Sequence, residues 1–126
     1  MDLTGKWKYQ EKYGIFEDED GNECFYGTAI GELFLTQKGE ELSGKIVFMD
    51  HPGDEQPYML QEFIEGRIEG DHIIIDAIEM DLIHSDEDIY YELDHWHGTL
   101  LNNNLIAGIS CDDQDVEGQF SFERIS

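Results

Sequence analysis

Two histidines in the segment DHWHG are the residues whose spacing most directly suggests chemistry. His95 and His97 are two positions apart, and residues at that spacing project from one face of a β-strand. Two imidazoles on one face can bind zinc or another transition metal when a carboxylate, here Glu62 or Asp76, completes the coordination. The other interpretation, which the common occurrence of His-x-His favours, is two rim histidines paired with surrounding acidic residues.

A second group of residues has the composition of a small-molecule site, in which a few polar groups stand in an apolar cup. Its candidate members are Trp7, Tyr58, Glu62, His72, Asp76, Tyr91 and His95. The alternative is an interior filled by bulky Ile, Leu, Phe and Met side chains, which would leave no room for a ligand.

Motifs of covalent and nucleotide chemistry do not occur. The sequence has no G-x-S-x-G, C-x-x-C, P-loop or G-x-G-x-x-G pattern. Carboxylates are so numerous that choosing two as an acid–base pair would be arbitrary. We therefore expect a protein that is not an enzyme and that carries no cofactor.

The elements that position these residues are predicted to be β-strands. Apolar residues alternate with polar ones or run continuously, and glycine interrupts them at short intervals, whereas no segment shows a convincing helical period. The eight predicted strands are 3–10, 24–37, 41–50, 57–68, 72–81, 88–101, 104–112 and 117–125. Short turns are predicted at Lys38-Gly39-Glu40, Gly70-Asp71 and Asn102-Asn103-Asn104, because Gly, Asn and Asp tolerate positive φ.

Alternation also assigns one face of several strands to the interior, and a one-residue bulge would reverse such an assignment. In 57–68 and 72–81 the predicted inward residues are Tyr58, Leu60, Glu62, Ile64, His72, Ile74, Asp76, Ile78 and Met80. In the last three strands they are Ile89, Tyr91, Leu93, His95, His97, Thr99, Leu101, Leu105, Ala107, Ile109, Cys111, Phe120, Phe122 and Arg124.

A row of antiparallel hairpins leaves two unpaired edges unless the sheet closes on itself. The sequence therefore predicts one all-β domain over residues 1–126, an eight-stranded antiparallel up-and-down β-barrel. An interior of eight strands is wide enough for side chains or for one small ligand.

Gly5-x-Trp7 near the start, eight meandering strands and Arg124 in the last strand together resemble the calycin superfamily of lipocalins, fatty-acid-binding proteins and avidins. The resemblance implies that Trp7 closes one barrel end and that Arg124 packs across its ring, where cation–π attraction adds to apolar contact. Glycine at position 5 would let the chain bend sharply there. The expected function is binding of a small apolar or amphipathic molecule.

"LTGKW" followed by "LTQKGEELSG" is most similar to the avidin branch. Avidins line their biotin pocket with several tryptophans, whereas this chain has only Trp7 and Trp96. Ile109 or a neighbour stands where a pocket tryptophan would be expected. Biotin is therefore not the expected ligand.

Charge restricts the possible partners. The chain has 30 Asp and Glu against 7 Lys and Arg, a net charge of −23. Such a field repels nucleic acid and anionic membranes and attracts basic protein surfaces. An alternative function is therefore an acidic interaction module, such as an immunity protein or a nucleic-acid-mimicking inhibitor of a basic partner. Its contact surface would come from the acidic runs 17–23, 85–88 and 112–117.

Location and redox state follow from simpler features. No apolar run approaches the roughly 18 residues of a membrane helix, and the first residues lack a secretion signal, so a cytoplasmic protein is expected. Cys24 and Cys111 are too few for a disulfide scaffold. Free buried thiols are expected, with a single bridge as the alternative.

Overall fold

The computed structural model describes residues 2–53, 56–84 and 93–125, apart from the side chains of 82 and 84. Eight long strands form a closed antiparallel barrel in the order β1-β10-β9-β8-β7-β6-β5-β4. Their bounds are β1 Gly5–Tyr13, β4 Gly27–Lys38, β5 Glu41–Pro52, β6 Tyr58–Glu69, β7 His72–His84, β8 Asp94–Asn102, β9 Leu105–Asp112 and β10 Glu117–Arg124. A short hairpin of β2 (Phe16–Glu17) and β3 (Glu23–Cys24) lies outside the barrel. The predicted all-β barrel is confirmed.

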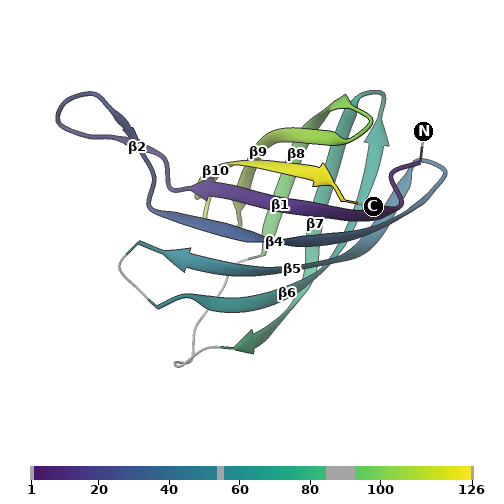
Figure 1. Ribbon diagram of the computed structural model, residues 1–126, viewed down its shortest axis with the longest axis horizontal. Helices are drawn as coiled ribbons and strands as arrows, with labels where there is room; N and C mark the ends of the chain where they lie inside the picture. Colours follow the sequence, from purple (N-terminus) through teal and green to yellow (C-terminus); the bar gives the residue numbers. More distant parts are fainter. Residues whose placement is uncertain (1, 54–55, 85–92, 126) are drawn as a thin grey trace.

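The barrel closes through β1, which pairs with the second long strand and with the last one (Figure 1). Trp7 lies opposite Leu33 of β4 on one side and opposite Arg124 of β10 on the other. Both chain ends lie at this end of the barrel, and the β2–β3 hairpin projects from the opposite end (Figure 1). We call these the proximal and distal ends. In the described part of the chain no helix is long and apolar enough to span a bilayer.

Six of the eight predicted strands overlap the observed ones closely. The three predicted turns also lie where the chain reverses, at 39–40, 70–71 and 103–104. The predicted strand 24–37 is wrong at its start, because Cys24 belongs to the β2–β3 hairpin and β4 begins only at Gly27. The predicted strand 88–101 falls partly outside the described residues.

Trp7 closes the proximal end. Its side chain is fully buried, and its indole Nε1 donates a hydrogen bond to the carbonyl oxygen of Leu3 at 3.0 Å. The guanidinium carbon of Arg124 lies 4.5 Å from the centre of the indole ring. This is the arrangement that the resemblance implied for the first tryptophan and the late arginine.

Gly5 shapes the chain just before this tryptophan. Its φ of 146° lies in a region that side chains rarely permit but glycine adopts readily. The backbone can therefore turn from Leu3, which is buried under the barrel, into β1. The spacing Gly5-x-Trp7 thus has a steric cause, because the glycine lets the chain place the indole across the proximal end. We call this closed end the floor of the barrel.

Arg124 also ties the N-terminal segment to the floor, and a substitution tests this. Its Nη1 and Nη2 donate to the carbonyl oxygens of Thr4 and Asp2 at 3.1 and 2.9 Å. We expect Arg124→Lys to lower the free energy of unfolding by about 1–2 kcal/mol, because one ammonium cannot replace the planar fork. Urea unfolding measures it, with the neighbouring exposed Glu123→Gln as the control. Equal midpoints for the two variants would contradict this role.

Candidate ligand-binding site

Four carboxyl side chains point into the barrel from four different strands, and we call them the interior carboxyl cluster. They are Glu11 of β1, Asp50 of β5, Glu62 of β6 and Asp94 of β8, all buried. Glu11, Asp50 and Asp94 belong to the strand halves nearer the distal end. The described buried residues include no Lys, Arg or His.

Glu62 is the most enclosed member. Its side chain has no solvent exposure, and its Oε2 accepts a hydrogen bond from the backbone N–H of Asp94 at 3.3 Å. Its other oxygen, Oε1, has no hydrogen-bond partner among the described residues. Burial, opposed by hydrogen bonds from Asp94 and reinforced by repulsion from Glu11 and Asp50, raises the pKa of Glu62 to about 7.

Glu11 lies against an aromatic group. Its Oε1 accepts a hydrogen bond from the indole Nε1 of Trp96 at 3.2 Å, and Tyr9 and Ser110 also hydrogen-bond its carboxyl group. Burial, followed by repulsion from Asp94, raises the pKa of Glu11 to about 7. The edge-to-face contact between Tyr9 and Trp96 (ring centres 6.0 Å apart) supports the indole that donates to this carboxyl group.

Asp50 is held by two phenols. The hydroxyl of Tyr13 donates to Oδ1 of Asp50, and the hydroxyl of Tyr58 lies 3.5 Å from Oδ2. Ala29 of β4 stands between Glu11 and Asp50 in the register of the sheet. Because alanine is small, the two carboxyl groups face the interior on either side of it with little bulk between them.

The predicted ligand-binding residues divide into three groups. Trp7, Tyr58 and Glu62 are buried in the interior as predicted. Asp76 and His95 are not, because both lie on the outer face, where Oδ1 of Asp76 is 2.8 Å from Nδ1 of His95. His72, at the start of β7, is exposed as well. Tyr91 lies outside the described residues.

The face of β7 that points inward was predicted wrongly for a physical reason. In β7 both faces are apolar, and the buried residues are Ile73, Ile75 and Ala77 rather than Ile74 and Ile78. A register shift between Phe63 and Ile64 of β6 then leaves Ile78 with no paired residue on β6. Beyond this bulge the alternation is offset by one residue, so Met80 packs against the core as predicted.

In β8 and β9 the face that points inward is the opposite of the predicted one. The inward residues are Asp94, Trp96, Ile106 and Ser110, and Ile109 is 65% exposed. His95, His97, Thr99 and Leu101 therefore face outward, as do Leu105, Ala107 and Cys111. The inward assignment of Phe120, Phe122 and Arg124 in β10 is confirmed.

His95 and His97 do share one face, but His95 is occupied by acidic residues. Its Nε2 lies 2.7 Å from Oδ1 of Asp113, in addition to the Asp76 contact at its other nitrogen. Partial burial opposes the charge, yet the hydrogen bonds to Asp113 and Asp76 outweigh it and raise the pKa of His95. This matches the interpretation of a rim histidine paired with acids. Among the described residues, no three His, Cys, Asp or Glu side chains form a metal site.

Sequence reasoning missed most of the interior carboxyl cluster. Glu11 could have been found, because Trp7, Tyr9 and Glu11 alternate along one strand and must share a face. Asp50 gave a weaker signal, because Val47 and Met49 on the other face of its strand are also apolar. Asp94 was assigned to the outer face, because Leu93 and His95 were predicted to point inward. The two cysteines are free thiols and only half-buried, so the expected full burial is wrong.

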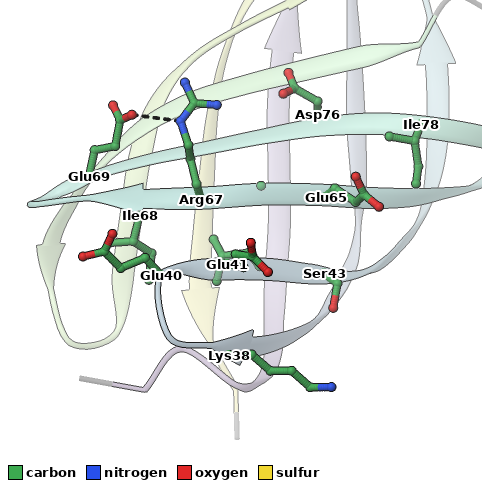
Figure 2. A pocket seen from close by; sticks show the side chains of 12 residues that line it. Lys38, Glu40, Glu41, Ser43, Glu65, Arg67, Ile68, Glu69, Asp76 and Ile78 are labelled. Carbon is green, nitrogen blue, oxygen red and sulfur yellow. Dashed lines mark hydrogen bonds and ion pairs between the residues drawn. The ribbon is translucent and has the colours of Figure 1, made fainter.

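An acidic groove lies on the outside of the barrel, over β5, β6 and β7 (Figure 2). It has a volume of about 660 Å³. Arg67 stands in it, ion-paired with Glu69 at 2.8 Å, and Glu41, Glu65 and Asp76 project around it (Figure 2). The groove is a surface feature separate from the interior carboxyl cluster.

Comparison with known proteins gives the fold and no family. No protein-family model matches the sequence, and no curated protein matches it significantly. Solved structures of designed barrels do match. A redesigned β-barrel, mFAP1, bound to DFHBI, has a TM-score of 0.61 and 14% identity, covering 97% of this chain and 94% of that chain.

Two further designed proteins show the same likeness. The redesigned barrel mFAP0, bound to DFHBI, has a TM-score of 0.59 and 14% identity over 97% of this chain and 98% of that chain. A fluorescence-activating β-barrel designed de novo has a TM-score of 0.51 and 17% identity over 98% of this chain and 94% of that chain. At these identities the likeness shows the fold alone.

Proposed function

We propose that the protein is a non-enzymatic, calycin-like barrel that binds a small amphipathic molecule between the interior carboxyl cluster and the distal end. The observation that carries the proposal is the polar cluster inside an otherwise apolar barrel. Burying four carboxyl groups is costly for folding, and structure alone gains nothing from them that apolar residues would not supply. A binding role supplies a reason for their presence.

The division of the interior supports this proposal. The proximal end is packed by Trp7, Leu33 and Ile46, none of them exposed. At the distal end the polar groups stand beside Tyr9 and other aromatic rings, which is the usual mixture in a small-molecule site. Barrels of the same fold are known to hold DFHBI, which makes the architecture suitable for such a role.

Native mass spectrometry of protein purified from its own host tests the proposal. We expect a one-to-one adduct of small-molecule mass that disappears under denaturing conditions. A titration with Nile red, a neutral amphipathic probe, should show one saturable site and quench the fluorescence of Trp96. A bare chain in every preparation, together with no saturable Nile red binding, would contradict the proposal.

A basic protein partner is the second candidate, and the acidic groove over β5–β7 is the observation that favours it. Glu41, Glu65 and Asp76 lie there with few cations to balance them. In the same mass spectra, this function would give a complex with a basic protein instead of a small adduct. Such a complex should dissociate as salt rises to about 1 M, because screening then acts within roughly 3 Å.

A further inference from the structure

The interior carboxyl cluster gathers acidic groups in a core that buries no basic ones. Glu11, Asp50, Glu62 and Asp94 all face the barrel interior, and the described buried residues contain no Lys, Arg or His. Buried carboxylates in proteins are normally paired with a cation or else held protonated. Ionised forms of Glu11 and Glu62 would therefore be stabilised by a positive charge brought from outside the chain.

Glu62 shows where such a charge would be received. Its Oε1 is completely buried and has no hydrogen-bond partner among the described residues, although its other oxygen is bonded to the backbone of Asp94. A buried acceptor left without a donor costs about 1–3 kcal/mol. The orphan oxygen therefore marks a position at which a ligand N–H group would be stabilising.

The walls around the cluster fit an organic cation better than a metal ion. Tyr9 and Trp96 lie beside Glu11, and Tyr9 also contacts Phe48 with ring centres 5.6 Å apart. Aromatic faces attract ammonium groups and also cover an apolar body. A metal ion would need several ligands close together, and no such group exists in the described part of the chain.

Charge around the distal end also favours a cation. The acidic runs 17–23 and 112–117 both lie in connections at that end, and the N–H of Gly14 donates to the carbonyl oxygen of Glu117 at 2.8 Å, which holds the two connections together. Clefts rimmed by one sign of charge concentrate ions of the other sign. A cation approaching the interior carboxyl cluster would therefore be drawn toward this end.

We propose that the interior carboxyl cluster binds a small primary ammonium ion carried on an apolar or aromatic body. The proposal rests on the ligand-binding function proposed above and names its ligand class. An N–H donor of the ammonium group would pair with the orphan oxygen of Glu62, and the rings of Tyr9 and Trp96 offer contact for the body.

Binding should release protons near neutral pH. Glu11 and Glu62 are partly protonated there, and a bound cation favours their ionised forms. Within the described part of the chain, the polar groups around them are Asp94 of β8, Ser110 of β9, Tyr9 and Tyr13 of β1, Asp50 of β5 and Tyr58 of β6. Their neighbours in the register of the sheet, such as Ala29, Ile46, Met80 and Phe120, do not titrate.

Isothermal titration calorimetry with phenethylamine tests the proposal, with phenethyl alcohol as a neutral probe of the same shape. We expect one site per chain and binding of the amine at least about tenfold tighter than the alcohol. The heat should differ between phosphate and HEPES buffers, because protons are released and neither buffer contains a primary amine. Calcium chloride is the inorganic control and should not displace the amine.

Glu62→Gln should weaken amine binding by about tenfold or more and leave alcohol binding unchanged. Glu79→Gln, an exposed position on the neighbouring strand β7 and outside the acidic groove, is the matched control and should bind like the parent. Near-UV circular dichroism establishes that both variants are folded.

The outcomes separate this proposal from the broader one. Equal affinity for amine and alcohol, or displacement of the amine by calcium, would overturn the ammonium proposal while the amphipathic-ligand function stands. Unchanged amine binding by Glu62→Gln would also overturn it. Failure of the amine, the alcohol and Nile red alike would remove both proposals.

Discussion

Replacing Trp7 with alanine is expected to lower the free energy of unfolding by about 3–5 kcal/mol, the usual cost of deleting a large aromatic side chain from a core. The indole is fully buried, donates to the carbonyl oxygen of Leu3 and carries the guanidinium of Arg124 on its face. Removing it leaves a cavity at the floor and unpairs both contacts. Because small domains are stable by only about 5–15 kcal/mol, the variant should be close to unfolding.

Urea unfolding followed by far-UV circular dichroism measures this effect. Phe16→Ala is the matched control, because Phe16 is also aromatic but is 53% exposed in β2, and its free energy of unfolding should stay within about 0.5 kcal/mol of the parent. The free energy of unfolding of Trp7→Phe should lie between those of the other two variants, since a smaller ring still fills part of the space. If Trp7→Ala unfolds at the parent's midpoint, the floor is held by other residues.

Stability is expected to fall as pH rises from about 4.5 to about 7, the range between the unfolded and folded pKa values of Glu11 and Glu62. Below this range both states are protonated. Within it the unfolded carboxyls ionise while the folded ones keep their protons, so rising pH favours unfolding. Above it both states are ionised and the loss is complete, at roughly 3 kcal/mol for one group.

Thermal and urea unfolding at about pH 4.5, 6 and 8 measure this dependence. Glu62→Gln and Glu11→Gln should each flatten it and be more stable than the parent at the highest pH, because a glutamine carries no charge to bury. Glu65→Gln should leave the slope unchanged. The stability lost when Glu11 ionises and the stability lost when Glu62 ionises will not simply add, because the two carboxylates repel each other. A parent protein whose stability rises over this range would refute the folded pKa values.

The fold could be predicted because its signals are local and repeated. Glycine and asparagine turns separate segments of strand composition, and Gly39, Gly70 and Asn103 mark reversals that the structure contains. The floor was predictable for a similar reason, since Gly5-x-Trp7 and Arg124 stand at opposite ends of the chain and only a closed sheet brings them together.

The interior was harder to predict, because alternation identifies a buried face only when one face is clearly apolar. β6 satisfies this condition, and Tyr58, Leu60 and Glu62 point inward as predicted. β7 has isoleucines on both faces, so its sequence alone cannot choose. A bulge near Ile78 then changes which residues of β7 point inward, and no local sequence pattern predicts this bulge.

Most of the interior carboxyl cluster was not predicted from the sequence, and the reason is informative. Asp94 and Ser110 are buried against the rule that polar residues face solvent, while Ile109 stays exposed. Positions that break local rules tend to be those where function competes with stability. The failure of sequence reasoning in β8 and β9 therefore falls beside the residues for which we propose a binding role.

The position of β1 between β4 and β10 determines when the barrel can close during synthesis. Each later strand can join its predecessor as it leaves the ribosome, but one side of β1 has no neighbour until Glu117–Arg124 has been made. The seam joins residues as much as 122 positions apart, such as Asp2 and Arg124. Until then two bare sheet margins are available to other nascent chains. The charge of −23 makes such chains repel each other, so acidity also protects the unfinished barrel.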